Sequence, residues 1–210
     1  MPRWFRRTYR EWARHQLQRR GHLDFLTSRP PHAYPPDFSD LWFLYKTVRR
    51  RKPTCVLEFG SGCSTVILAQ ALWDNERESL GEFGGRLYSV NADSYWADAT
   101  RQYLPTHLRT ICQVTYSPLL EIECFGTLAF RHEKVPDVTP DFLYLDGPDL
   151  TPDRRVAADV LDIEERFQPG FCLVVDGRKE NTAFLIQHLK GNYLYRYRRQ
   201  FRNAVFELVS

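Results

Sequence analysis

The segment most suited to chemistry in this sequence is a glycine-containing turn, Glu58-Phe59-Gly60-Ser61-Gly62-Cys63-Ser64-Thr65. The apolar run at 55–59 that leads into it predicts a buried strand, and the run STVILAQALW that follows predicts a helix. Glycines at the end of a strand let the backbone turn tightly and approach a ligand without a Cβ in the way. The first turn of the next helix offers unpaired N–H groups to polar or negative atoms. The pattern therefore predicts a ligand-binding loop.

Two nucleotide-binding patterns fit this loop poorly. A P-loop needs Gly-Lys-Ser/Thr at its end, and the loop has no lysine. A dinucleotide fingerprint needs a third small residue three positions after Gly62, where this chain has Thr65. The acidic residue that this fingerprint places further along the chain has no clear counterpart either. A nicotinamide-dependent oxidoreductase therefore stays as a secondary interpretation.

Two aspartates follow apolar runs later in the chain. Asp146 comes after FLYL (142–145), and Asp176 comes after FCLVV (171–175). Because the carboxyl ends of parallel strands meet at one edge of a sheet, we expect both carboxylates beside the glycine loop. There they can activate a hydroxyl, hold a divalent metal, or cap the helices that follow. Asp146 is the first candidate for the catalytic base.

The elements that must position these residues alternate along the chain. Strands are predicted at 55–59, 86–90, 110–116, 142–145 and 171–175, with helices at 94–104, 152–167 and 181–189 between or after them. The stretch 117–140 is interpreted as a short helix and an edge strand. The last two runs alternate like a hairpin around 201–203. This order predicts an α/β fold with a doubly wound, mostly parallel sheet.

The N-terminal quarter differs from the rest in charge. Residues 1–52 contain 13 Lys+Arg and 4 Asp+Glu, a balance of +9, so the remainder carries −6 of the net +3. Residues 3–20 and 38–50 predict helices, joined by a Pro-rich connector at 29–36 on which His32 and Tyr34 are candidates for a lid. We divide the chain into this extension (1–52) and a ligand-binding domain (53–210). Residues 1–20 are expected to contact an anionic surface or a second subunit, or to form a solvated helical face.

The cysteines and the hydropathy predict a cytoplasmic protein. The five cysteines are odd in number and form no Cys-x-x-Cys pair, which is typical of reduced thiols. No apolar run is long enough for a transmembrane segment, and the N-terminus has no signal-peptide pattern.

Four segments of the chain resemble those of class I S-adenosylmethionine-dependent methyltransferases. They are, in this order over roughly residues 53–209, VLEFGSGCST, LYSVNADSYW, PDFLYLDGPD and PGFCLVVDGR. The resemblance implies a seven-stranded Rossmann-like sheet with a reversed final strand. It also implies residues that hold S-adenosylmethionine, in the glycine loop (Glu58, Gly60, Ser61, Gly62, Ser64, Thr65) and after the second strand (Asn91, Asp93). The family normally has an acidic residue at the position of Asn91, and Asp93 is the candidate to replace it.

The resemblance extends to metal-dependent O-methyltransferases, in which carboxylates at these strand ends join an asparagine to hold magnesium. On that basis Asp146 and Asp176 are candidate Mg²⁺ ligands. Gly177 occupies the usual place of the third ligand, so Asn181 or Asp149 would have to supply it.

These features predict a methyltransferase that acts on an oxygen atom of a small molecule or a glycan. Two observations disfavour a nucleic-acid substrate. The sequence after the fourth strand, Leu145-Asp146-Gly147-Pro148, differs from the Asn/Asp-Pro-Pro-aromatic sequence of DNA amino-methyltransferases, and no nucleic-acid module is recognisable. The main alternative is a non-catalytic scaffold that keeps the sheet but has lost cofactor use, for which Asn91 is the motivation.

Overall fold

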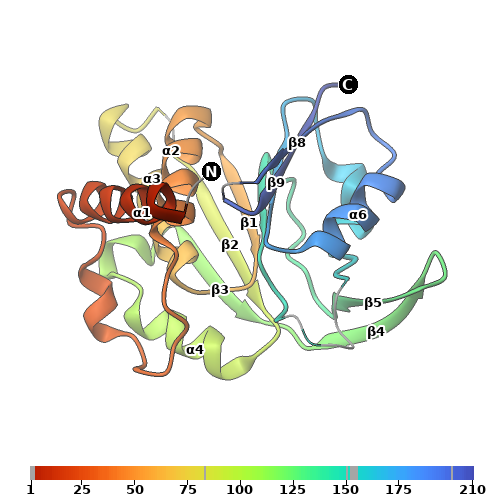
Figure 1. Cartoon of the computed structure of the whole chain (residues 1–210), viewed down its shortest axis with the longest axis horizontal. Helices are drawn as coiled ribbons and strands as arrows, with labels where there is room; N and C mark the ends of the chain where they lie inside the picture. Colours follow the sequence, from red (N-terminus) through yellow and green to blue (C-terminus); the bar gives the residue numbers. More distant parts are fainter. Residues whose placement is uncertain (1–2, 83, 150, 152–155, 200) are drawn as a thin grey trace.

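A seven-stranded sheet forms the centre of the protein in the computed structural model, which describes residues 3–82, 84–149, 151, 156–199 and 201–210. Its strand order is β3-β2-β1-β6-β7-β9-β8, and a separate two-stranded sheet is formed by β4 and β5 (Figure 1). The strands are β1 (Cys55–Phe59), β2 (Arg86–Asn91), β3 (Cys112–Tyr116), β4 (Leu119–Cys124), β5 (Thr127–His132), β6 (Phe142–Leu145), β7 (Cys172–Asp176), β8 (Tyr193–Arg198) and β9 (Asn203–Leu208). The α-helices are α1 (Arg3–Gln18), α2 (Phe38–Arg51), α3 (Cys63–Glu78), α4 (Ser94–Tyr103), α5 (Asp159–Asp162) and α6 (Lys179–His188).

The pairing of the strands confirms the predicted topology. Strands β3, β2, β1, β6 and β7 are parallel, whereas β9 pairs antiparallel with both β7 and β8. The sheet is therefore mostly parallel with a reversed strand at one end, as in the Rossmann-like methyltransferase fold. The carboxyl ends of β1, β2, β6 and β7 all lie at one edge, where the loops after them meet.

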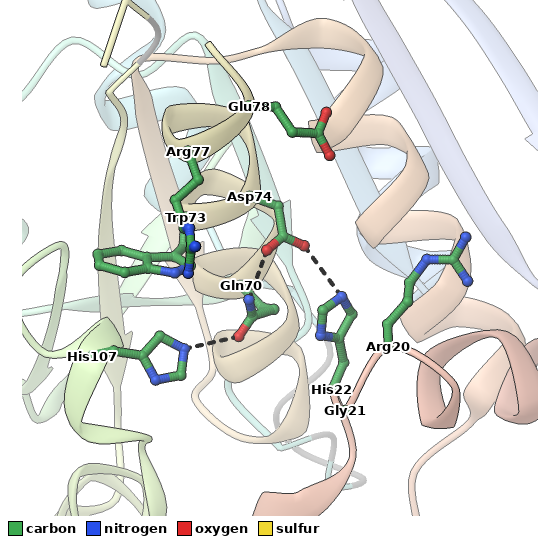
Figure 2. Close-up of a pocket in the computed structure, with 9 residues that line it drawn as sticks. All are labelled: Arg20, Gly21, His22, Gln70, Trp73, Asp74, Arg77, Glu78 and His107. Atoms are coloured by element: carbon green, nitrogen blue, oxygen red, sulfur yellow. Dashed lines mark hydrogen bonds and ion pairs between the residues drawn. The ribbon is translucent and has the colours of Figure 1, made fainter. Parts of the chain in front are cut away.

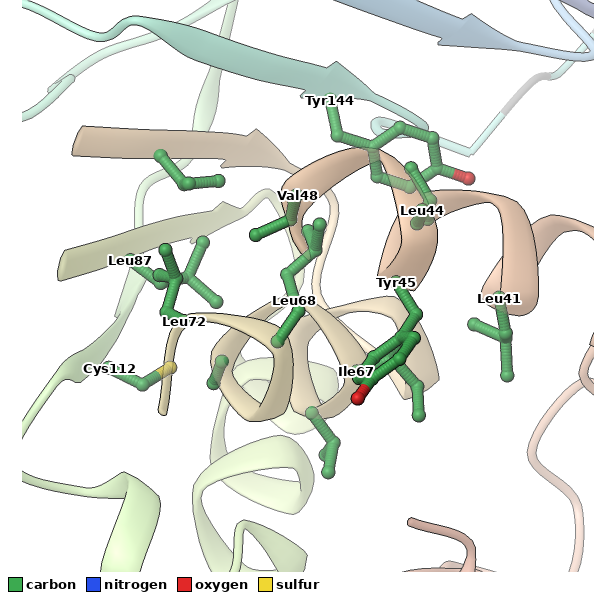
Figure 3. Close-up of a cluster of buried hydrophobic side chains, with 14 of the residues drawn as sticks. Leu41, Leu44, Tyr45, Val48, Ile67, Leu68, Leu72, Leu87, Cys112 and Tyr144 are labelled. Atoms are coloured by element: carbon green, nitrogen blue, oxygen red, sulfur yellow. The ribbon is translucent and has the colours of Figure 1, made fainter. Parts of the chain in front are cut away.

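Helices cover the sheet on two faces because successive side chains of each strand point in opposite directions. One face, which includes Val56 and Phe142, packs against α2, α3 and α4. The other face, which includes Leu57 and Leu143, packs against α5 and α6. Figure 3 shows the first of these layers, where Leu44 of α2 and other apolar side chains of α2 and α3 lie beneath the strands.

The N-terminal helices share this core. Ala13 and Leu17 of α1 are fully buried, and α1 lies across α2 (Figure 1). On the outer surface the guanidinium of Arg14 lies 5.3 Å from the Phe38 ring centroid. Part of the basic segment therefore has a packing role. The expected contact of residues 1–20 with an anionic surface or a second subunit stays a prediction, as does the cytoplasmic location. In the part of the chain that is described, no helix combines the length and apolar character required for a membrane span.

The helix predicted at 152–167 is not continuous in the structure. In its described part, Ala157 forms a β-bridge with Phe130, and helical structure is limited to α5 and a 3₁₀ turn at 164–166; residues 152–155 lie outside the described part of the chain. The backbone at 156–158 pairs with Phe130 of β5, and both amide atoms of the Asn181 side chain bind the Ala157 backbone at 2.9 and 3.0 Å. Asp159 also accepts a hydrogen bond from the His132 backbone at 2.8 Å. These partners replace the hydrogen bonds that a helix would make.

The interpretation of 117–140 as a short helix and an edge strand is also wrong. This stretch contains the antiparallel hairpin of β4 and β5, which turns at Phe125 and Gly126 with φ angles of 52° and 72°. Two consecutive positive φ angles are typical of a tight hairpin turn.

Candidate active site

The glycine loop between β1 and α3 is built on a close contact with the loop after β6. Gly60 has a φ of +96°, and a Cβ added there would lie 2.6 Å from the Gly147 nitrogen. The Gly60 N–H donates to the Val90 carbonyl at 2.8 Å, which ties the turn to the end of β2. Only glycine satisfies both the backbone angle and the approach of the neighbouring loop.

Glu58 and Thr65 support this loop from below. Both are fully buried, and the Glu58 carboxylate accepts hydrogen bonds from Thr65 Oγ1 at 2.6 Å and from Ser89 Oγ at 2.7 Å. Thr65 Oγ1 in turn accepts from the Gly62 N–H at 2.9 Å. These two side chains hold the shape of the loop from inside the core and do not line the cavity, so their expected contact with the cofactor stays a prediction.

The buried Glu58 carboxyl makes the stability of the fold depend on pH. Burial raises its pKa to about 7, against the lowering effect of hydrogen bonds from Ser64, Thr65 and Ser89. A raised folded-state pKa stabilises the protein fully below the unfolded value near 4.5, and this stabilisation is lost as the pH rises through about 7. The loss is on the order of 3 kcal/mol. Wild type should lose about this much unfolding free energy from pH 5 to pH 8, whereas Glu58→Gln should not. The stability of Glu58→Gln relative to wild type should therefore rise by about this much between the two pH values, measured by urea denaturation.

The exposed glutamate Glu82 provides the matched control for this experiment. Glu82→Gln should follow the wild-type curve at both pH values. Parallel curves for Glu58→Gln and wild type would show that the buried carboxyl does not titrate in this range.

Asn91 orients the loop from the end of β2. Its Nδ2 donates to Ser61 Oγ at 2.7 Å, and its Oδ1 accepts from the Asp93 backbone N–H at 2.8 Å. The Asp93 carboxylate caps α4 by accepting from the Trp96 N–H at 3.1 Å. A carboxylate at position 91 has no proton to donate to the serine when ionised. Asn91 therefore has a structural role, because its amide group holds the glycine loop in position.

A cavity of about 590 Å³ opens at the carboxyl edge of the sheet, above this loop. It brings together most of the predicted site residues from four strand ends. Those in its wall are Gly60, Ser61, Gly62, Ser64, Asn91, Asp93, Asp146 and Asp176. The opposite wall comes from the Pro-rich connector and the first turn of α2.

A second cavity of about 300 Å³ adjoins the first one. The two share four wall residues, Tyr34, Asp146, Asp149 and Asp176, and the smaller one adds Gly177 and Arg178. Asp146 thus stands on the boundary of two compartments. This arrangement suits a reaction between two molecules, each held in its own compartment.

The carboxylates along this boundary hold protons more tightly than usual. Burial, and then the neighbouring Asp146, raise the pKa of Asp176 to about 7. Burial and the charges of Asp176, Asp37 and Asp146 raise the pKa of Asp40 to about 9. The Asp146 side chain is exposed at the cavity wall; desolvation by the protein around it raises its pKa, which Arg178 partly offsets. These groups therefore cannot all be ionised together at neutral pH.

Arg178 is the cation whose positive charge acts on the Asp146 carboxyl group. It is almost fully buried, and its Nη2 donates to the Asp146 carbonyl at 2.8 Å and to the Pro148 carbonyl. The guanidinium therefore fixes the loop after β6 and supplies a positive charge beside the carboxylate.

The residues present do not fit the expected magnesium site. The described part of the chain contains no group of three Asp, Glu, His or Cys side chains that could hold a metal ion. Asn181, a candidate third ligand, is fully buried and uses both amide atoms on the Ala157 backbone. Asn181 is therefore not free to be the third ligand, Asp149 does not complete a three-residue group with Asp146 and Asp176, and no step of the reaction is derived through a metal. The assignment of Asp146 and Asp176 as Mg²⁺ ligands stays a prediction.

The sequence analysis missed several wall residues that come from distant segments. Asp37 and Asp40 reach the cavity from the start of α2, and Tyr144 reaches it from β6. Of the two lid candidates, Tyr34 lies in the wall of both cavities and is 77% exposed. His32 instead stacks against Tyr95 at the start of α4, with ring centroids 5.5 Å apart.

The histidine at 107 belongs to a separate cavity of about 530 Å³ on the outer side of α3. Figure 2 shows a chain of contacts there that links His107, Gln70, Asp74 and His22. The distances are 3.1 Å from His107 Nε2 to Gln70 Oε1, 2.8 Å from Gln70 Nε2 to Asp74 Oδ1, and 3.2 Å from His22 Nε2 to Asp74 Oδ2. This chain joins α3 to the turns after α1 and α4, away from the glycine loop.

Comparison with known proteins identifies the family of this arrangement. Residues 57–177 match the profile of the family described as "Methyltransferase domain". Among curated proteins, none matches the chain. A methyltransferase from Podospora anserina, solved with bound S-adenosylhomocysteine, is similar in structure over 100% of this chain and 89% of its own, with 12% identity and a TM-score of 0.58. A putative caffeoyl-CoA O-methyltransferase from Staphylococcus aureus is similar over 98% and 99%, with 11% identity and a TM-score of 0.57. An O-methyltransferase from Bacillus cereus, in complex with S-adenosylhomocysteine, is similar over 97% and 91%, with 16% identity and a TM-score of 0.51.

Proposed function

Because the chain belongs to the methyltransferase-domain family, we propose that it transfers the methyl group of S-adenosylmethionine to an oxygen atom of a small molecule or a glycan. The large cavity would hold the methyl donor, and the adjoining small cavity would hold the acceptor. Asp146, on the boundary between them, would accept the proton of the acceptor hydroxyl.

The charge of the large cavity is the observation that carries this proposal. Its described wall contains six aspartates and one arginine: Asp37, Asp40, Asp93, Asp146, Asp149, Asp176 and Arg29. Asp40 and part of the Asp176 population hold a proton at neutral pH, but the remaining carboxylates still outnumber the arginine. The wall therefore attracts a cationic sulfonium and repels the pyrophosphate of a nicotinamide dinucleotide. The same observation argues against the oxidoreductase alternative. The non-catalytic scaffold stays the main alternative, because the amide of Asn91 is engaged by Ser61 and Asp93.

S-adenosylmethionine supplies, when bound, an electrophilic methyl carbon on a positively charged sulfur. The protein then has two tasks, which are to place the acceptor oxygen in line with that carbon and to remove the hydroxyl proton. As the new O–C bond forms, the C–S bond breaks and its electron pair stays on sulfur, which becomes neutral. Asp146 takes the proton, and Arg178 stabilises the carboxylate before the transfer. Tyr34, from the connector, covers both compartments and would limit the entry of water.

Isothermal titration tests the first step of this proposal. We expect saturable binding of S-adenosylmethionine and S-adenosylhomocysteine with micromolar Kd, and the same Kd with magnesium or with EDTA. NADH should not bind, because its phosphates meet the carboxylates of the cavity. Binding of NADH without binding of either sulfur compound would overturn the proposal, and a Kd that tightens with magnesium would reinstate a metal site.

A further inference from the structure

A basic groove lies between α2 and the final strand pair, on the sheet face that α2 and α3 leave uncovered. We define the basic groove by its lining residues: Arg20, Phe43, Tyr45, Lys46, Thr47, Arg49, Arg50, Arg51, Glu78, Cys172, Leu194, Arg196, Arg198, Val205 and Glu207. It encloses about 720 Å³. None of these residues lines the cavities at the carboxyl edge of the sheet.

The two walls of the basic groove face each other with like charges. The α2 wall carries Lys46 and three arginines, the β8 wall carries Arg196 and Arg198, and Arg20 lies at one end, so seven cations line the groove with two glutamates. Each glutamate is already paired with an arginine: Glu78 with Arg49, and Glu207 with Arg51 at 2.6 Å. Within the described chain, none of the other five cations is paired with either groove glutamate, although the charge of Asp40, outside the groove, acts on Arg198. Seven cations against two glutamates leave a local charge of about +5.

Arg198 is packed between aromatic rings in the groove and has a buried donor without a partner among the described residues. Its guanidinium carbon lies 3.7 Å from the Phe43 ring centroid and 4.2 Å from that of Phe201, and its Nη1 is buried with no hydrogen-bond partner among the described residues. Burial, then the charges of Arg198 and Arg50, lower the pKa of Lys46. A buried donor without a partner and a lowered lysine pKa both cost stability, and a bound anion would relieve both.

We propose that the basic groove binds a compact anion that carries two or more phosphate groups. Guanidinium groups match phosphate oxygens with paired hydrogen bonds, and cations on two facing walls require charge on two sides of the ligand. The enclosed volume suits a small molecule, whereas a membrane surface is too flat to reach both walls. A nucleic-acid strand would need open rings for base stacking, but Phe43 is covered by Arg198, and Tyr45 is buried with its hydroxyl bound to Asp74.

Tripolyphosphate is the probe for this site, titrated into the full chain at constant ionic strength and without magnesium. We expect saturable binding, a higher Tm, and a Kd at least tenfold tighter than that of sulfate. The Arg50→Ala/Arg196→Ala variant removes one exposed cation from each wall and should weaken binding by tenfold or more. Lys46→Met, a single change on the α2 wall, should weaken it as well.

The control is Lys134→Ala/Lys190→Ala, which removes two exposed cations outside the groove and should bind tripolyphosphate as wild type does. Binding of S-adenosylhomocysteine should be unchanged in all variants. The same set of proteins therefore shows that the two sites bind their ligands independently. The proposal is overturned if tripolyphosphate binds no better than sulfate, or if the groove variants bind it as tightly as wild type. It is also overturned if vesicles with phosphatidylglycerol or single-stranded RNA bind where tripolyphosphate does not.

Discussion

Replacing Asp146 with asparagine is expected to lower the rate of methyl transfer by about 10²- to 10⁴-fold, the usual contribution of a positioned general base. The asparagine has nearly the shape of the aspartate but cannot take the hydroxyl proton. The rate would be measured as transfer of a tritiated methyl group from S-adenosylmethionine to hydroxyl-bearing molecules of a cell extract. Binding of S-adenosylhomocysteine should change little, because the substitution removes one of six aspartates in the cavity.

The pH profile gives an independent readout for the same residue. Because the pKa of Asp146 is raised, the wild-type rate should climb with pH through a range higher than that of an ordinary carboxyl group. The Asp146→Asn variant should lack this climb. Asp149→Asn changes a neighbouring exposed carboxylate of the same wall and should keep the rate within about threefold. A large loss in Asp176→Asn together with a near-normal rate in Asp146→Asn would assign the base to Asp176 instead.

Gly60→Ala should lower the free energy of unfolding by about 2–5 kcal/mol. The alanine must adopt a φ of +96° and must displace the backbone of Gly147, since its Cβ would lie 2.6 Å from the Gly147 nitrogen. Backbone strain of this kind costs about 1–3 kcal/mol, and overpacking costs a similar amount. Such a loss is a large part of the stability of an ordinary domain, about 5–15 kcal/mol. Urea denaturation measures it.

Gly62→Ala is the matched control, two residues along the same loop. Its φ of 171° is an extended conformation open to any residue, and a Cβ there meets no atom within 4 Å. The variant should therefore lose less than about 1 kcal/mol of stability. Because Gly62 lies in the cavity wall, it should still bind S-adenosylhomocysteine more weakly. Equal losses of stability in the two variants would contradict the contact between the two loops.

The central strands could be predicted because each is a short apolar run bounded by breaking residues. The predictions for β1 and β6 agree with the structure at both ends, and the terminal hairpin was placed correctly from its alternation. The hairpin of β4 and β5 was missed because its buried side is small: only Ala129 and His132 of β5 are buried, and no residue of β4 is, so the sequence shows no clear alternation. The one signal for it was Phe125-Gly126. The helix predicted over 152–167 is interrupted because the backbone of Phe130 in β5 and the side chain of Asn181 in α6 bind the backbone at 156–158, and no local pattern reveals such partners.

The site was predictable where residues end strands and unpredictable where distant segments fold over them. Asp146 and Asp176 follow apolar runs, so their meeting at the sheet edge follows from parallel topology alone. Asp40 lies more than a hundred residues earlier in the chain and reaches the cavity only through the packing of α2. The burial of Glu58 has a local cause: it lies between Leu57 and Phe59, so its side chain points to the opposite face from theirs, into the core against α3.

The strand order also affects how the chain can fold while it is being synthesised. β1 pairs with β2 on one side and with β6 on the other. The pairing of Val56 with Phe142 can therefore form only after residue 142 has left the ribosome. Until then β1 has an open edge, and the face that carries Leu57 and Phe59 has no covering helix. A nascent chain of about 120 residues would thus expose an apolar sheet face and an unpaired strand edge, which chaperones or a neighbouring copy of the chain could bind. The junction between β1 and β6, on which the ligand loops converge, therefore forms only after β1, β2 and β3 have all been synthesised.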